Sequence, residues 1–112
     1  MKQAIERRGR RFLKRIFTEQ EISYCESKKM KYEHYAARFA AKEAVMKAAE
    51  VRRKNYYQFR EIEVTRLATG KPKIHMSKTS LKRFGIAKKH KFELSMAHER
   101  DFAIASVLLI TS

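Results

Sequence analysis

The chain has 112 residues, of which 27 are lysine or arginine and 12 are aspartate or glutamate, so its formal net charge is +15 at pH 7. This length fits a single domain, residues 1–112, and a hydrophobic content of 44% is typical of a globular chain. The longest apolar run, residues 102–110, is far shorter than the roughly 18 residues of a membrane span, so the sequence predicts no membrane-spanning segment. The basic N-terminus lacks the apolar segment of a signal peptide, and the single cysteine, Cys25, suits a reducing cytoplasm. We expect Cys25 to be a packing residue and the protein to be cytoplasmic.

Residues 2–17 are predicted to form a helix, because apolar side chains recur in them at helical spacing. Gly9 lies inside this helix at a cost of about 1 kcal/mol relative to alanine, which indicates a bend or a close contact. Glu6 is the only acidic residue of the segment, and its basic residues are Lys2, Arg7, Arg8, Arg10, Arg11, Lys14 and Arg15. A charge this unbalanced favours an anionic partner.

Thr18 and Glu21 have the spacing of a capping box, which predicts a second helix over about residues 19–27. A basic linker, residues 27–31, leads into a third helix that is predicted to run to about residue 51.

The third helix contains the alanine-rich stretch RFAAKEAVMKAA, residues 38–49. Glu43 and Lys47 lie one turn apart on it, and two interpretations stay open. They form an ordinary i,i+4 ion pair worth a few tenths of a kcal/mol, or Glu43 is an oxygen ligand for Mg²⁺ and Lys47 binds phosphate.

The second half of the chain predicts strands. Residues 61–67 and 73–76 form one hairpin, and residues 91–99 and 100–110 form another, with a short helix over residues 77–86 between the two. Both faces of the last strand are apolar, so we expect this strand to be central in its sheet or buried. The expected class is therefore α+β, with N-terminal helices packed on a small antiparallel sheet.

The histidines carry no metal-ligand spacing. His98 stands at a strand end, where an ordinary turn histidine is the common case, and we read His34, His75 and His90 as non-functional. The high positive charge favours nucleic acid as a partner. However, no aromatic residues alternate with the arginines of the first helix, which weakens a role in base stacking.

Four segments resemble, in the same order, holo-[acyl-carrier-protein] synthase, the small bacterial phosphopantetheinyl transferase. They are RRFLKRIFTEQE (10–21), ARFAAKEAVMKA (37–48), the EIEV strand with its TGKP turn (61–72) and ELSMAHERDFAIASVLL (93–109). The resemblance implies a 4′-phosphopantetheinyl transferase-like α+β fold. It also implies a Mg²⁺-dependent transfer of 4′-phosphopantetheine from coenzyme A to a serine of apo acyl carrier protein, releasing adenosine 3′,5′-bisphosphate in fatty acid biosynthesis. The family forms homotrimers with active sites at subunit interfaces.

The resemblance assigns roles residue by residue. Glu43 matches the metal ligand, Lys47 the lysine at the phosphates and His98 the histidine at the pyrophosphate, and these are the expected catalytic residues. The expected coenzyme-binding residues are Lys29, Lys31, Arg38, Lys47, Ser95 and His98. The helix that docks the acidic acyl carrier protein contains Ile5, Arg8, Arg11 and Phe12.

The chain departs from the family pattern in three places. The family's N-terminal strand, which supplies a second metal ligand from an Asp, has no counterpart in residues 1–112. The glycine-rich loop after the third helix is replaced by the glycine-free segment 51–58, and Ala97 replaces the second serine before His98. We expect a form without the Asp strand to be weakly active or inactive, and the sequence does not identify the acyl carrier protein or decide whether the trimer persists.

Two alternatives follow. An impaired form only binds acyl carrier protein through its basic helix. A nucleic-acid-binding domain would extend a basic stripe over Lys82, Arg83, Lys88 and Lys89. The second alternative is disfavoured, because an acidic carrier protein explains the charge at least as well.

Overall fold

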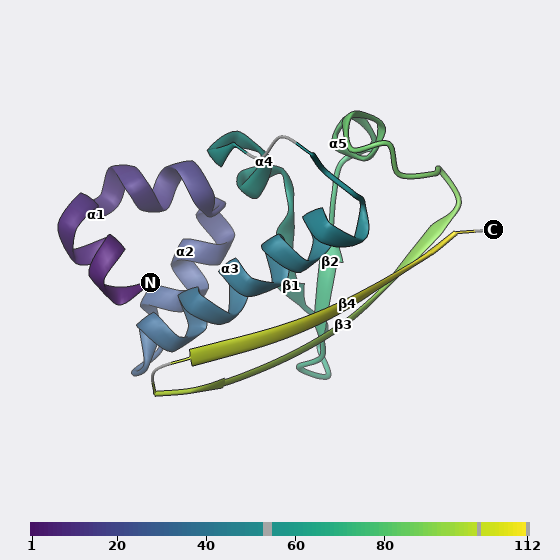
Figure 1. The fold of residues 1–112 in the computed structure, drawn as a ribbon. Helices are drawn as coiled ribbons and strands as arrows, with labels where there is room; N and C mark the ends of the chain where they lie inside the picture. Colours follow the sequence, from purple (N-terminus) through teal and green to yellow (C-terminus); the bar gives the residue numbers. More distant parts are fainter. Residues whose placement is uncertain (53–54, 101, 112) are drawn as a thin grey trace.

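The computed structural model describes residues 1–52, 55–100 and 102–111, without the side chain of Tyr56. In these residues the elements are α1 (Lys2–Ile16), α2 (Glu19–Glu26), α3 (Lys31–Ala48), α4 (Tyr56–Glu61), β1 (Glu63–Arg66), β2 (Pro72–His75), α5 (Lys78–Arg83), β3 (His90–Glu99) and β4 (Phe102–Thr111). Helix α3 crosses the middle of the molecule, with the N-terminal helices on one side and the long β3–β4 hairpin on the other (Figure 1). The predicted α+β class is confirmed.

Helix α1 is bent at Gly9, where φ is 69° and ψ is −156°. A Cβ added at Gly9 would meet nothing within 4 Å, so the positive φ, and not a close contact, requires glycine here. The predicted bend is confirmed. It lets Ile5 on one half and Phe12, Leu13 and Ile16 on the other all turn into the core.

The capping box of α2 is confirmed. The Thr18 backbone N–H donates to Glu21 Oε1 at 2.9 Å, and the Glu21 N–H donates to Thr18 Oγ1 at 3.3 Å. Cys25, at the end of α2, is fully buried, and burial raises the pKa of its thiol to about 12. Its predicted role as a packing residue is therefore confirmed.

Helix α4 lies where the sequence predicted a loop and the start of a strand. Asn55 caps it, because the Gln58 N–H donates to Asn55 Oδ1 at 3.2 Å and the Asn55 N–H donates to Gln58 Oε1 at 2.9 Å. Residues 53 and 54 of the predicted loop lie outside the described residues. Strand β1 therefore begins at Glu63, two residues later than expected.

The strands form two separate antiparallel pairs, β1–β2 and β3–β4. Gly70 takes a φ of 90° in the first turn, as the sequence predicted. The second hairpin pairs ten residues on each strand, from His90 with Thr111 to Glu99 with Phe102. Residue 101 of the predicted tight turn lies outside the described residues.

The expectation that β4 is central in its sheet or buried on both faces is wrong for the single chain. One face packs on the core through Ala105, Val107 and Leu109. The other face is open, and its exposed apolar side chains are Phe102, Ile104, Leu108 and Ile110. The reason is that α3 packs on one face of the β3–β4 hairpin, and no element among the described residues covers the other face. None of the helices in the described part of the chain combines the length and apolar character needed to cross a membrane.

Candidate functional site

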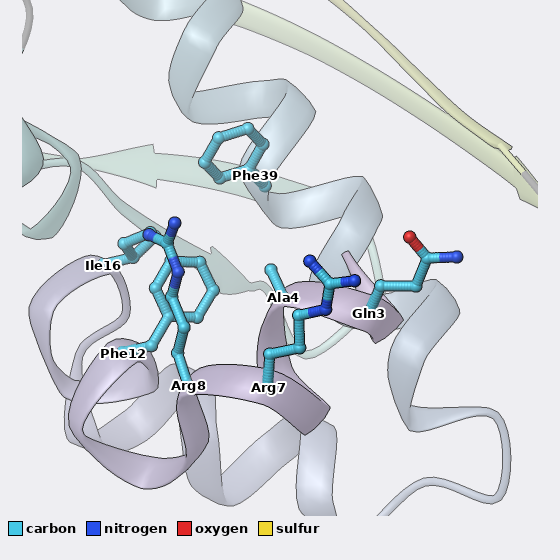
Figure 2. Close-up of a pocket in the computed structure, with 7 residues that line it drawn as sticks. All are labelled: Gln3, Ala4, Arg7, Arg8, Phe12, Ile16 and Phe39. Carbon is cyan, nitrogen blue, oxygen red and sulfur yellow. The ribbon is translucent and has the colours of Figure 1, made fainter.

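A hollow of about 340 Å³ lies between α1 and α3. Its lining residues are Gln3, Ala4, Arg7, Arg8, Phe12, Ile16 and Phe39 (Figure 2). We call it the docking hollow. The guanidinium of Arg8 lies 5.8 Å from the centre of the Phe12 ring, and Phe39 stacks on Phe59 with ring centroids 4.9 Å apart. The hollow therefore combines apolar side chains with a cationic rim.

The residues predicted to bind the carrier protein divide between this hollow and its surroundings. Arg8 and Phe12 line the hollow. Ile5 is buried on the side of α1 that faces the core, and Arg11 lines a separate basic groove with Arg10. Sequence reasoning missed Phe39, because its place opposite α1 depends on how two helices pack.

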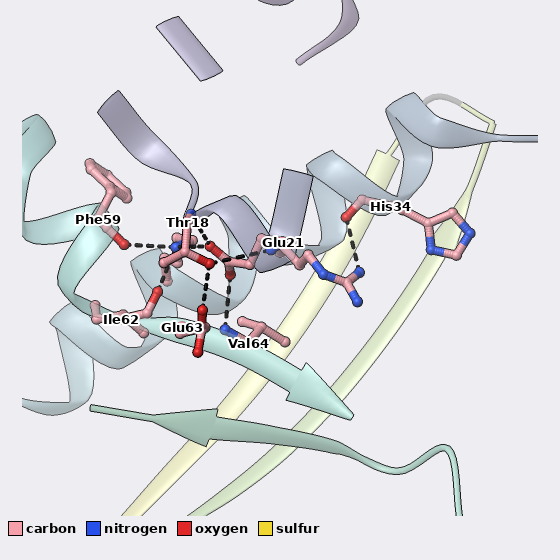
Figure 3. Close-up of polar contacts among 9 residues, drawn as sticks. Thr18, Glu21, His34, Phe59, Ile62, Glu63 and Val64 are labelled. Atoms are coloured by element: carbon pink, nitrogen blue, oxygen red, sulfur yellow. Dashed lines mark hydrogen bonds and ion pairs between the residues drawn. The ribbon is translucent and has the colours of Figure 1, made fainter. Parts of the chain in front are cut away.

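Helix α3 buries the ammonium group of Lys42. Lys42 Nζ donates to Glu21 Oε1 and to the Phe59 carbonyl, both at 2.7 Å, and to the Ile62 carbonyl (Figure 3). Both charged side chains are fully buried. Glu21 Oε2 in turn accepts from the Val64 N–H at 2.8 Å. Burial lowers the pKa of Lys42 while Glu21 opposes this, and the three acceptors match the three N–H donors of a charged ammonium. Lys42 therefore joins α3 to α2 and to the end of α4, and Glu21 extends this connection to β1.

Arg38, one turn earlier on α3, is also buried, with 1% of its surface exposed. Its guanidinium lies 4.1 Å from the centre of the Tyr24 ring. In the part of the chain that the structure describes, its one hydrogen bond, from Nη1 to the His34 carbonyl, is long at 3.5 Å, and Nε has no partner. Among the described residues, no carboxylate pairs with Arg38.

Two more cations approach the same ring. Lys28 Nζ lies 4.7 Å and the Arg66 guanidinium 5.5 Å from the centre of Tyr24. The His34 ring meets Tyr24 edge-on at 5.6 Å. We call this group, with Arg38, the Tyr24 cluster. Burial lowers the pKa of His34, and His98 and the cations of the cluster lower it further. Lys28, Arg38 and Arg66 make no ion pair with an acidic residue in the described ranges, so the cluster has the positive charge to attract an anion.

His98 extends the cluster across to β3. Its Nδ1 lies 3.0 Å from Glu33 Oε1, and its ring centroid is 5.0 Å from that of His34. When Nδ1 carries the proton, it donates to Glu33, and Nε2 keeps its lone pair. A hollow of about 480 Å³ opens beside the pair, lined by Glu33, His98, Glu99, Arg100 and Phe102. His34, which the sequence analysis read as non-functional, thus contacts the predicted catalytic histidine.

The remaining predicted coenzyme ligands lie in different places. Lys29 is exposed in the α2–α3 turn, and Lys31 pairs with Glu26 at 3.4 Å. Ser95 is exposed, and because side chains alternate along a strand, it points to the opposite face of β3 from His98. The structure therefore does not bring Ser95 and His98 together within one chain.

Glu43 and Lys47 occupy the C-terminal end of α3. Glu43 is half-buried and Lys47 is exposed. They make no ion pair with each other or with another residue in the described ranges, so the i,i+4 pair that the sequence left open is not formed. Ten residues separate Glu43 from Glu33, which is about 15 Å along the helix axis. The Glu43 end and the His98 end of α3 are therefore two distinct regions.

The donor set at Glu43 fits Mg²⁺ only in part. Within the described ranges, no three histidine, cysteine, aspartate or glutamate side chains gather as a metal-binding group. Mg²⁺ is commonly bound by one or two carboxylates, with water and substrate phosphates filling its other positions. The carboxylate of Glu43, with no partner in the described residues, is compatible with that mode of binding.

Comparison with known proteins shows the family of the chain. The sequence model of the 4′-phosphopantetheinyl transferase superfamily matches residues 1–107. A holo-[acyl-carrier-protein] synthase from Ruminiclostridium cellulolyticum is 40% identical over 110 residues, which cover 97% of this chain and 82% of that protein. The chain belongs to the holo-[acyl-carrier-protein] synthase family of transferases.

Solved structures of this family share the fold. The synthase of Helicobacter pylori in complex with coenzyme A has a TM-score of 0.80 at 28% identity, covering 97% of this chain and 90% of that one. The synthase of Bacillus anthracis, described in complex with coenzyme A (3′,5′-ADP), has a TM-score of 0.76 at 34% identity, covering 98% and 89%.

Proposed function

We propose that this protein transfers 4′-phosphopantetheine from coenzyme A to a serine of apo acyl carrier protein, in a Mg²⁺-dependent reaction of fatty acid biosynthesis. Arg38 is the observation that carries the proposal. A fully buried guanidinium without a carboxylate partner in the described residues is costly unless a ligand supplies the negative charge. The family membership identifies coenzyme A as the ligand with suitable phosphates.

The Tyr24 cluster is our proposed site for the 3′-phosphate of coenzyme A. Arg38 and Lys28 approach one ring, and Lys29 and Lys31 lie in and just after the adjacent α2–α3 turn. Arg66 adds a cation from β1 that the sequence analysis did not include. A dianionic phosphate would meet positive charge from three elements of the fold.

Glu43 and Lys47 are our proposed groups at the pyrophosphate. Mg²⁺ held at Glu43 would neutralise charge on the leaving adenosine 3′,5′-bisphosphate. Lys47, exposed one turn away, would bind a phosphate oxygen. In the reaction, the serine oxygen forms a bond to the phosphorus next to pantetheine, and the bond from that phosphorus to the bridging oxygen breaks. The serine hydroxyl loses its proton, for which His98 Nε2 is a candidate acceptor.

His98 and Glu43 can act on one coenzyme only if the site bridges about 15 Å of α3 or if a second copy supplies one of them. We favour the second arrangement, in a homotrimer. The open face of β4 supports it, because Phe102, Ile104, Leu108 and Ile110 form an exposed apolar surface that another copy would cover.

Acyl carrier protein is proposed to dock at α1. The docking hollow offers an apolar floor at Phe12 and Phe39 inside an arginine rim, which suits an acidic protein with an apolar side chain to insert. Nucleic acid is a weaker candidate partner. We also propose a cytoplasmic location, with which the free, buried Cys25 thiol is compatible.

Incubation with apo acyl carrier protein, coenzyme A and Mg²⁺ tests the proposal, with the mass of the carrier protein as the readout. We expect the mass to rise by one phosphopantetheine, the rise to be lost in Glu43→Gln, and carrier binding to weaken with salt and in Arg8→Glu. A second arm adds the family's N-terminal Asp-bearing strand. No mass gain in either arm would overturn the transferase proposal. Retained carrier binding would then favour an impaired binding form, and salt-dependent binding of RNA or DNA without carrier binding would favour the nucleic-acid alternative.

A further inference from the structure

A pocket of about 500 Å³ is lined by residues of α5 and of the segment that follows it. Helix α5 lies at the end of the molecule away from α1 (Figure 1). Its lining residues are Lys78, Leu81, Lys82, Ile86 and Lys88. We call it the α5 pocket. None of these residues belongs to the docking hollow, the Tyr24 cluster or the region around Glu43. The α5 pocket is therefore separate from the sites proposed for the transferase reaction.

The charged residues that line the α5 pocket are all lysines. The sequence holds no acidic residue between Glu63 and Glu93. The basic residues that do find acids lie outside the pocket, since Arg83 pairs with Glu61 at 2.6 Å and Lys91 with Glu93 at 2.9 Å. The ammonium groups of Lys78, Lys82 and Lys88 make no ion pair or hydrogen bond with any residue in the described ranges.

The floor of the pocket is aliphatic. Leu81 is half-buried, and Ile86 retains 7% of its surface. Lysine stems add methylene groups around them. The lining contains no aromatic ring on which a nucleobase would stack. A concave site of this volume, with an aliphatic floor and three lysines in its lining, has the form of a small-molecule site.

We propose that the α5 pocket binds a single-chain aliphatic anion. The hydrocarbon chain packs on Leu81 and Ile86, and a carboxylate or phosphate head group is held by the three ammonium groups at the rim. Lysine suits such a head group as a flexible point charge. A concave floor encloses one chain, whereas adsorption to a lipid bilayer needs apolar side chains that project outward. This proposal does not depend on the transferase activity, so the failure of either leaves the other standing.

Titration with octanoate, followed through the NMR signals of the leucine and isoleucine methyl groups, tests the proposal. We expect saturable shifts centred on Leu81 and Ile86. Acetate has the charge without the chain, and 1-octanol has the chain without the charge, so both should bind more than about tenfold more weakly than octanoate. Anionic phospholipid vesicles and a short RNA form the remaining arms.

Lys82→Glu should weaken octanoate binding by more than about tenfold. Lys89→Glu is the matched control, because it makes the same charge change at an exposed residue that does not line the pocket, and it should leave the affinity within about twofold. Leu81→Ser should also weaken octanoate binding, because it removes apolar contact without changing the charge. Chemical shifts of core methyl groups verify that each variant is folded.

Three results would overturn the proposal. Equal losses in Lys82→Glu and Lys89→Glu would mean that net charge alone attracts the ligand. Binding to vesicles without binding to monomeric octanoate would mean a membrane surface, and binding to RNA alone would mean a nucleic-acid surface.

Discussion

Two buried cations on α3 differ in whether an acidic residue of the fold pairs with them. Arg38 and Lys42 are one turn apart, and each retains 1% or less of its surface. The ammonium of Lys42 has three oxygen acceptors, including the Glu21 carboxylate. The guanidinium of Arg38 has a single long hydrogen bond and no acid in the described ranges.

This difference indicates a structural role for Lys42 and is consistent with the ligand-binding role that we propose for Arg38. A buried ion that meets its partners within the fold contributes to the specificity of packing, and its loss leaves its partners unsatisfied. A buried ion without them is held in place by packing, here against Tyr24, and its field remains for a ligand. Burial and positive charge are the same in the two cases, so the hydrogen-bond and ion-pair partners distinguish the two roles.

Replacing Lys42 by methionine should give the largest effect. Glu21 would remain buried without its cation, so we expect the free energy of unfolding to fall by about 3–5 kcal/mol. Urea unfolding measures this change. Lys47→Met, on the same helix but exposed, should change stability by less than about 0.5 kcal/mol. If the two variants were equally stable, the structural role of Lys42 would be wrong.

Arg38→Leu should affect ligand binding more than stability. We expect little change in stability, within about 1 kcal/mol, because no carboxylate is left unpaired. Affinity for coenzyme A should fall by about 10- to 100-fold, which corresponds to the loss of one charge-assisted contact. Calorimetry with coenzyme A and with its analogue lacking the 3′-phosphate measures both affinities.

The analogue makes this test specific. The preference for coenzyme A over the analogue should shrink in Arg38→Leu and persist in Arg60→Leu, since Arg60 is exposed on α4 and lies outside the Tyr24 cluster. An unchanged preference in Arg38→Leu would place the 3′-phosphate elsewhere.

Glu33→Gln tests how His98 is held in the proposed reaction. Glu33 would act as a positioning residue, through the 3.0 Å contact between its Oε1 and His98 Nδ1. We expect kcat to fall by about tenfold or more while the KM for coenzyme A changes less. The ¹⁵N shifts of the His98 ring should show a changed tautomer ratio, and Glu33→Asp should restore part of the activity. A lower kcat without any change in those ring signals would make the effect merely structural.

Local signals in the sequence predicted much of the fold. The Thr18 capping box, the bend at Gly9 and the turn at Gly70 depend on a few adjacent residues and are present in the structure. The capping box at Asn55 and Gln58 is an equally local signal, and it would have predicted α4. The open face of β4 could not be predicted, because alternation within a strand does not tell how many strands pair or stack beside it.

The site residues divide in the same way. The resemblance in motif identified Arg38, Glu43, Lys47 and His98, whose roles remain predictions. It did not predict that Lys42 forms a buried ion pair, because the partner, Glu21, lies 21 residues away in the sequence. Glu33 and His98 are 65 residues apart. Contacts at such distances along the chain arise from tertiary packing and leave no periodic pattern.

The smallest expected effect is a dependence of stability on pH at the Tyr24 cluster. Burial, His98, Arg38, Arg66 and Lys28 hold the pKa of His34 below its usual value. The folded protein therefore binds a proton at His34 less readily than the unfolded chain does. This contribution to stability is fully present above the unfolded pKa of about 6.5 and is lost as pH falls from there through the folded pKa, by less than about 1 kcal/mol in a partly solvated site.

Urea unfolding between pH 7.5 and 5 measures this slope. His34→Gln should flatten it, whereas His75→Gln, at an exposed residue of β2, should leave it unchanged. Inorganic phosphate should also reduce the slope, because an anion at Arg38 would offset the positive charge that opposes protonation of His34. The same response to phosphate in Arg38→Leu would mean that the anion binds elsewhere, and the distinction between Arg38 and Lys42 would lose its basis.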